Sequence, residues 1–234
     1  MKICFLGSPA HYSQLVKQAL IEAKYQLTDD PGESDLLVVA AHGAKITPKL
    51  LTSTKFDGLN IHPSLLPKYR GATPVPHTIL NGDKETGITI IKMSNVIDAG
   101  QIVAQIKAEV KPGDTSADLL NRLFALGAKL LIEILPDYLA GKIALKSQPE
   151  TSPTPYCHRF TKKDGFITWK QFLTGRDSEE LNRKIRAFFP WPGIFTTMPN
   201  QKTLKLLPGH RLQLEGKQPI SYQQFMAGYK HLLQ

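Results

Sequence analysis

Residues 56–71 read FDGLNIHPSLLPKYRG, a short apolar strand pattern that runs into a turn with two prolines. Successive side chains of a strand point to opposite faces, so Asn60 and His62 should point into the same space. Pro63 and Pro67 restrict the backbone that leaves the strand, which makes the turn stiff. An amide and an imidazole held together at a strand end indicate the edge of a functional site.

Apolar runs alternate with helical patterns on both sides of this stretch. Residues 35–41, DLLVVAA, are apolar almost throughout, as expected for a strand buried on both faces. Other strands are predicted over 2–9, 86–93 and 101–110, and helices over 11–25, 73–83 and 115–140. The pattern predicts an α/β fold with a Rossmann-like, mostly parallel sheet, helices on both faces, and ligands beyond the carboxyl ends of the strands.

The composition limits the class of protein. The 234-residue chain is 41% hydrophobic, which is enough for a packed core. No apolar run approaches the roughly 18 residues of a membrane span, and the first residues lead directly into a strand pattern. Cys4 and Cys157 have neither the pattern of a disulfide framework nor the spacing of zinc ligands, so both are expected to be reduced. We therefore expect a cytoplasmic protein without a membrane partner or a metal.

The net charge of +9 is concentrated near the end of the chain. Residues 1–150 contain 16 Lys and Arg against 15 Asp and Glu, whereas residues 151–234 contain 13 against 5. Cations that contact a phosphate backbone release counterions, so this concentration favours a phosphate-rich partner. A basic face exposed only to solvent is the alternative.

A stretch rich in Pro, Ser and Thr coincides with the change of charge and predicts a linker. We predict a catalytic domain over residues 1–146, the linker over 147–156 and a small basic domain over 157–234. Within the small domain, helices are predicted over 178–188 and 221–233, with short strands between them. For the aromatic residues of this domain, core packing is favoured over base stacking; they are Phe188, Phe189 and Trp191.

The polar residues after two predicted strands suggest a reaction. Taken alone, Asp98 would more often form a turn and His62 more often a structural hydrogen bond. Together, an imidazole and a carboxylate can take a proton from an attacking amine, while the Asn60 amide donates to the oxygen that becomes negative. This set favours acyl transfer to an amine. Ser64 lacks the glycines of a nucleophile elbow, and GSP at residues 7–9 lacks those of a dinucleotide fingerprint.

The same residues carry a resemblance to a known family. The segments 60–62, 64–67, 69–71, 85–87 and 98–100 together resemble the 10-formyltetrahydrofolate-dependent formyltransferases, over about residues 35–110. The resemblance implies a formyltransferase fold in which Asn60, His62 and Asp98 form the catalytic set. It also implies folate contacts in three segments, the first being part of a loop at 42–46; these contacts are Ile46, then Ser64, Leu65, Leu66 and Pro67, then Asn95, Val96 and Ile97.

The tail resembles one branch of that family. Residues 160–169, 184–196 and 215–228 are similar to the C-terminal module of methionyl-tRNA formyltransferases. This similarity implies an abbreviated, OB-like β-rich domain and formyl transfer from 10-formyltetrahydrofolate to initiator methionyl-tRNA. A monomer is expected.

Two alternatives stay open because TDDPGES, at residues 28–34, replaces the further strand, helix and basic loop usual in the family. One is a formyltransferase that acts on a nucleotide-linked amino sugar. The other is a protein that binds tRNA or folate without catalysis.

Overall fold

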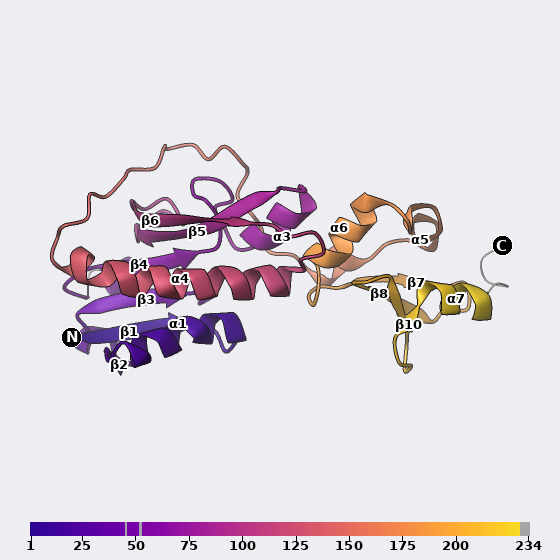
Figure 1. Cartoon of the computed structure of the whole chain (residues 1–234), viewed down its shortest axis with the longest axis horizontal. Helices are drawn as coiled ribbons and strands as arrows, with labels where there is room; N and C mark the ends of the chain where they lie inside the picture. The colour runs from indigo at the N-terminus through magenta and orange to yellow at the C-terminus, as the bar shows by residue number, and fades with distance from the viewer. Residues whose placement is uncertain (45, 52, 230–234) are drawn as a thin grey trace. The chain divides into compact units, whose positions relative to one another are not determined.

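The structure is a computed structural model that describes residues 1–44, 46–51 and 53–229 (Figure 1). Its main element is a six-stranded sheet with the order β2-β1-β3-β4-β5-β6. The strands are β1 (Lys2–Gly7), β2 (Gln26–Thr28), β3 (Leu36–Ala40), β4 (Gly58–His62), β5 (Glu85–Lys92) and β6 (Ile102–Glu109). Pairing is parallel from β2 to β4, and β5 is antiparallel to both of its neighbours. The predicted mostly parallel sheet is therefore confirmed, with one reversed strand.

Helices cover both faces of this sheet. They are α1 (His11–Glu22), α2 (Pro48–Leu51) and α4 (Ser116–Leu139); a 3-10 turn, η1 (Pro31–Glu33), follows β2, and α3 (Pro74–Leu80) follows the loop after β4. Gly127 of α4 lies so close to the sheet that a Cβ atom there would be 2.9 Å from Ile61 Cγ2. The rings of Tyr12 in α1 and Phe124 in α4 are 5.2 Å apart, so both helices lie on the same face.

The opposite face of the sheet packs against α2. Leu51 of α2 forms a buried cluster with Cys4, Leu37 and Val39. Ile61 of β4 points toward α4, and its neighbours along the strand must point the other way. Asn60 and His62 therefore both lie on the face that α2 partly covers, as the period of two predicts.

The end of the chain forms a smaller, β-rich structure. Its strands are β7 (Ile194–Thr197), β8 (Thr203–Leu207), β9 (Arg211–Leu214) and β10 (Ile220–Ser221), paired antiparallel in the order β10-β9-β8-β7. Its helices are η2 (Lys162–Gly165), α5 (Trp169–Gly175), α6 (Glu179–Ala187) and α7 (Tyr222–Gly228). The predicted small β-rich domain is confirmed. The part of the predicted terminal helix beyond residue 229 lies outside the described residues.

The aromatic residues between α6 and β7 have different environments. Phe188 is 3% exposed and packs against Phe160 with 4.6 Å between the ring centroids, as predicted for core packing. Trp191 is 60% exposed, so the core interpretation is wrong for this residue. Trp191 lies in the turn between α6 and β7, where its ring remains at the surface.

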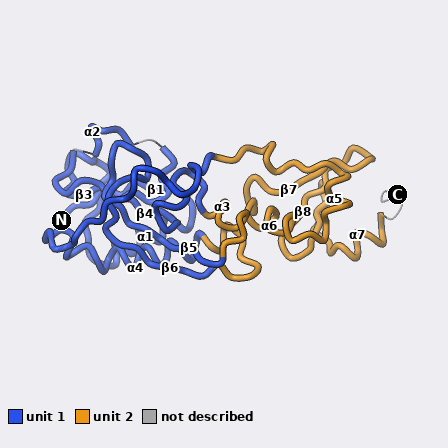
Figure 2. Tube along the Cα trace, turned by 90° about the horizontal axis from the view of Figure 1, so that it is seen from above, with its two compact units in different colours: residues 1–74, 84–109, 120–158 blue, residues 75–83, 110–119, 159–234 orange. Residues whose placement is uncertain are grey.

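Two compact units make up the chain (Figure 2). The first contains residues 1–74, 84–109 and 120–158, and the second contains 75–83, 110–119 and 159–234. The predicted division into 1–146, 147–156 and 157–234 stays a prediction. No helix among the described residues is long and apolar enough to cross a membrane.

The short elements were not predicted. β2, α2 and α5 contain 3, 4 and 7 residues, too few for a hydrophobic period to become visible. The helix predicted over 11–25 ends at Glu22, since the chain must turn there to reach β2.

Candidate active site

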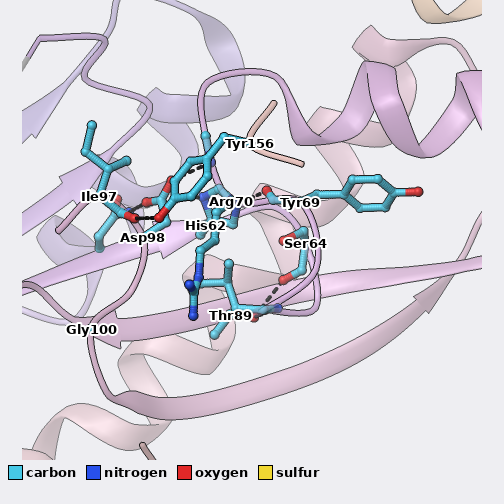
Figure 3. A network of polar contacts seen from close by, with 12 residues as sticks. His62, Ser64, Tyr69, Arg70, Thr89, Ile97, Asp98, Gly100 and Tyr156 are labelled. Atoms are coloured by element: carbon cyan, nitrogen blue, oxygen red, sulfur yellow. Dashed lines mark hydrogen bonds and ion pairs between the residues drawn. The ribbon is translucent and has the colours of Figure 1, made fainter. Parts of the chain in front are cut away.

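Three polar side chains, those of Asn60, His62 and Asp98, meet on the face of the sheet opposite α4; Figure 3 labels His62 and Asp98. Asp98 Oδ1 accepts a hydrogen bond from Asn60 Nδ2 at 3.2 Å and lies 3.6 Å from His62 Nδ1. Asn60 and His62 come from β4, and Asp98 comes from the loop between β5 and β6. The structure thus brings together the amide, the imidazole and the carboxylate that the sequence singled out.

Asp98 reaches this place by an unexpected path. In a parallel sheet the carboxyl ends of the strands share one edge, but β5 is antiparallel to β4, and Lys92 at its end pairs with Leu59 near the start of β4. Met93 N–H donates to Gly58 O, and Lys92 N–H donates to Gln101 O. The loop between β5 and β6 therefore begins and ends beside the start of β4. The loop between them brings Asp98 to the side chains of β4.

The two ring nitrogens of His62 face different groups. The residue is 4% exposed, and Nε2 lies 2.9 Å from Tyr69 O. A carbonyl oxygen can only accept, so Nε2 must carry a proton and Nδ1 of the neutral ring must be unprotonated. A proton taken up at Nδ1 would lie beside the Asp98 carboxylate. Nδ1 is therefore the ring nitrogen that can accept a proton, as a general base requires.

Asp98 is held by donors at both carboxylate oxygens. Oδ2 accepts the Gly71 N–H at 2.9 Å, and Oδ1 accepts from Asn60; the side chain is 11% exposed. One of the two N–H bonds of the Asn60 amide is used in this way. The second is the group that could donate to a substrate oxygen.

The loop after β4 contains four residues that the resemblance assigns to folate. Ser64 is buried, its hydroxyl donates to Lys68 O at 2.6 Å, and its carbonyl accepts from Thr89 Oγ1 at 2.6 Å. Leu66 is also buried, in a cluster with Ile91 and Ile102. Leu65 and Pro67 are half-buried. Ser64 and Leu66 therefore hold the loop in shape, whereas Leu65 and Pro67 keep part of their surface exposed.

The other residues assigned to folate lie in two further loops. Val96 and Ile97 are each 59% exposed, and Asn95 is exposed beside them, directly before Asp98. Ile46 packs against the cluster of β1, β3 and α2. Lys45, in the loop at 42–46, lies outside the described residues. Val96 and Ile97 thus offer an apolar surface next to the carboxylate.

Two polar atoms that the sequence did not single out are buried near this sheet edge. Ser8 Oγ and His42 Nδ1 have no hydrogen-bond partner among the described residues. Ser8 follows β1 and His42 follows β3. Because β1, β3 and β4 are parallel, their carboxyl ends lie at the same edge of the sheet. A buried polar atom without a partner costs free energy, so a ligand that supplied one would be favoured. The signal in the sequence is that each residue follows a strand, and His42 also begins the loop at 42–46 that the resemblance assigns to folate.

Cys4 and Cys157 are both free and buried. Burial raises the pKa of the Cys157 thiol to about 11, and the nearby Asp98 carboxylate adds to this effect. A thiol with such a pKa is not a nucleophile near neutral pH.

Comparison with known families identifies two matching models. Formyl transferase matches residues 9–135, and Formyl transferase, C-terminal domain, matches residues 159–211. Methionyl-tRNA formyltransferase of Dehalococcoides mccartyi is 35% identical over 84% of this chain and 71% of its own length. The enzymes with the same name from Methylococcus capsulatus and Treponema denticola are 39% and 37% identical, over 71% and 83% of this chain. The chain spans 52% and 58% of the length of these two relatives.

Solved structures with a similar fold are more distant in sequence. A variant of HypX from Aquifex aeolicus has a TM-score of 0.74 and 20% identity, over 88% of this chain and 39% of its own. HypX in complex with tetrahydrofolic acid has a TM-score of 0.69 and 19% identity. A sugar N-formyltransferase from Shewanella has a TM-score of 0.65 and 17% identity, over 88% of this chain and 96% of its own. At these identities the comparison supports the fold alone.

Proposed function

Because this chain belongs to the formyl transferase family, we propose that it transfers a formyl group from 10-formyltetrahydrofolate to the amino group of methionyl-tRNA. The observation that carries the proposal is the convergence of Asn60, His62 and Asp98 within 3.6 Å. The relatives named methionyl-tRNA formyltransferase support the choice of acceptor. 10-Formyltetrahydrofolate supplies the formyl group as the second substrate.

His62 is the proposed general base. Its Nδ1 takes the proton of the amine as the amine nitrogen bonds to the formyl carbon. Asp98 stabilises the imidazolium and keeps the ring in place, while Tyr69 O accepts from Nε2. The proton held at Nδ1 is then available for the folate nitrogen, whose bond to the formyl carbon breaks. This route needs no covalent intermediate on the protein.

Asn60 is the proposed donor to the formyl oxygen. Attack on the formyl carbon converts this oxygen from a carbonyl into an oxyanion, so a fixed N–H group beside it stabilises the transition state more than the substrate. The bond from Asn60 Nδ2 to Asp98 orients the amide and leaves its second N–H for this task. One carboxylate therefore positions both the base and the oxyanion donor.

The folate ring system is proposed to lie against apolar residues of two loops, the loop that carries Asp98 and the loop after β4. Val96 and Ile97 of the first loop are exposed, and Leu65 and Pro67 of the second are half-buried. Ligand sites for ring systems are largely apolar, with few polar groups that fix orientation. Asn95 and Ile46 are also proposed to contact the folate, while Ser64 and Leu66 hold the loop after β4 in shape.

The second unit is proposed to contact the tRNA. Trp191 is 60% exposed, and Lys162 Nζ lies 5.8 Å from the centroid of its ring. Both residues and Lys205 line a depression of about 220 Å³ within this unit. An exposed aromatic ring beside two cations can stack a base while the cations neutralise phosphates. We further propose that the protein acts as a monomer in the cytoplasm, which sedimentation at several concentrations would test.

A direct assay tests the function. The purified protein is incubated with 10-formyltetrahydrofolate and initiator methionyl-tRNA, and formyl-methionine is measured after release from the tRNA. Parallel reactions contain elongator methionyl-tRNA and a nucleotide-linked 4-amino sugar. We expect transfer to the initiator tRNA and none by His62→Ala. Transfer only to the sugar would replace the acceptor, and transfer to no amine would refute the proposal.

A further inference from the structure

Arg70 is a cation enclosed in the first unit, with 1% of its surface exposed. Its guanidinium donates to Gln148 Oε1 from Nε at 3.2 Å and from Nη2 at 2.9 Å. It also donates to the carbonyls of Pro149, at 2.8 Å, and Glu150, at 3.2 Å. These acceptors are uncharged oxygens of one short segment. An enclosed cation is costly unless its N–H groups are satisfied, so Arg70 and this segment must stay together.

Arg70 decides which way the Gln148 amide points. Arginine has only donors, so the amide oxygen must face the guanidinium and the NH2 group must face away. Gln148 Nε2 then donates to Asp98 O at 3.0 Å and to Gly100 O at 2.7 Å. The flipped amide is excluded, because its NH2 group would face the guanidinium and its oxygen would face the two carbonyls. Figure 3 shows Arg70, His62, Asp98 and Gly100 in the same polar region.

Arg70 and Gln148 together form a clamp on Asp98, a residue with an unfavourable backbone conformation. Asp98 has a φ of 52°, in the left-handed region that costs a residue with a side chain about 1–2 kcal/mol. Gln148 binds carbonyls on both sides of Ala99, which restrains the turn that follows Asp98. The backbone N–H of Gly71, next to Arg70, donates to the Asp98 carboxylate. Arg70 thus restrains Asp98 through its neighbouring peptide and through Gln148.

The rest of the segment 148–158, which we call the strap, binds the loop after β4. Ser152 Oγ donates to Pro67 O at 2.8 Å, and Tyr69 N–H donates to Thr154 Oγ1 at 2.8 Å. Tyr69 is the residue whose carbonyl holds His62 Nε2. Cys157 N–H donates to Arg70 O at 2.7 Å, which closes the strap over the loop. The strap therefore contacts the loop that orients His62 and the loop that carries Asp98.

We propose that Arg70 and Gln148 are positioning residues for formyl transfer, which hold the Asp98 carboxylate against His62 and Asn60. This proposal rests on the proposed function. It assigns a catalytic consequence to the strap, a segment whose composition suggests only a linker. Neither Arg70 nor Gln148 touches the reacting atoms in this mechanism, because both act through Asp98.

Gln148→Glu removes the donors to the loop that carries Asp98 while it keeps the contact with Arg70. A glutamate keeps the contact with Arg70 and strengthens it by its charge, but it has no N–H for Asp98 O and Gly100 O. We expect kcat to fall by about 10- to 100-fold, since displacement of a catalytic group by about 1 Å can cost that much. KM for 10-formyltetrahydrofolate should stay near wild type. The urea midpoint should fall, because a carboxylate oxygen then faces the carbonyl oxygens of Asp98 and Gly100, so kcat is compared in the absence of urea, where the variant is folded. Arg70→Lys, which keeps the charge but loses the paired donors, should also lower kcat.

A double variant tests whether the effect passes through Asp98. If Gln148 acts only by placing this carboxylate, Gln148→Glu should cause little further loss in a protein that already carries Asp98→Asn. The proposal would be overturned if the loss of kcat in the double variant equalled the product of the two single losses, or if Gln148→Glu had a wild-type kcat. Thr73→Val is the matched control, because it removes a hydrogen bond to His158 O at the end of the strap opposite Gln148 and none of the bonds to Asp98. Its kcat should be unchanged.

A measurement without turnover keeps this proposal separate from the proposed function. The ring signals of His62 can be recorded by NMR in histidine-labelled protein and assigned with a His62→Gln sample. They should shift in Gln148→Glu and remain in place in Thr73→Val. Unshifted signals in Gln148→Glu would overturn the positioning role. If the wild-type protein formylated no amine, the proposed function would fail and this comparison would still decide the role of Gln148.

Discussion

Replacing Asp98 by asparagine should slow formyl transfer by about 1,000-fold. In the proposed transition state the carboxylate faces a cationic His62 ring across 3.6 Å, and the two side chains are 11% and 5% exposed. At an effective dielectric constant of about 20, opposite unit charges at this distance attract by about 4–5 kcal/mol, which corresponds to roughly three powers of ten in rate. Asparagine has the same shape, so the loss should come from the charge.

The asparagine would also be poorly oriented. If its oxygen accepts the Gly71 N–H, its NH2 group faces the NH2 group of Asn60, and it can donate to the unprotonated Nδ1 of His62 and so occupy the base; the opposite orientation directs NH2 at Gly71 N–H. Either choice leaves donors facing each other, which should cost about 1–3 kcal/mol of stability. The variant should remain folded, and its urea midpoint would show the loss. The rate is measured in single turnovers with saturating substrates, so that binding does not limit it.

Asp57→Asn is a suitable control. Asp57 also has a left-handed φ, 62° against 52° for Asp98, so asparagine fits both backbones equally well. Its carboxylate pairs with Lys92 at 2.8 Å and is 48% exposed, so the loss of its charge should leave the rate unchanged. A rate for Asp98→Asn within about tenfold of wild type would refute the electrostatic argument. An equal loss in both variants would show that the effect is not specific to the site.

Three further predictions concern other residues. Asn60→Ala should lower kcat by about 100- to 1,000-fold, as expected for a lost oxyanion donor, with retention of tRNA on a low-salt column unchanged. Lys162→Ala should reduce the slope of log Kd against log salt for tRNA by about 1, and Trp191→Ala should weaken binding with little change in that slope. An unchanged affinity for tRNA in both variants would show that this surface does not contact the tRNA. Finally, the pKa of Cys157 is raised from 9.0 to about 11, so the folded protein holds this proton more tightly than the unfolded chain. Its contribution to stability is complete below about pH 9 and is lost as the pH rises toward 11, and Cys157→Ala should reduce the fall of the urea midpoint over this window.

Much of the fold follows from local patterns. The apolar run over 35–41 and the long helical pattern over 115–140 correspond to β3 and α4, because burial and periodicity act over neighbouring residues. The period of two in β4 was sufficient to place Asn60 and His62 on one face. The basic excess of the last 84 residues was likewise visible in the composition. These features depend on the order of residues within one element.

Other features depend on segments that are distant in sequence. The reversed direction of β5 is set by its pairing with β4 and β6, and the position of Asp98 follows from a loop that returns along β4. The tautomer of His62 depends on a carbonyl seven residues away, and the clamp on Asp98 depends on Arg70 and Gln148, 78 residues apart. The sequence determined which polar groups were present and which of them share a strand face, since strand geometry is local. Only the tertiary structure decided which groups meet, because hydrogen bonds between distant loops form after the sheet has brought those loops together.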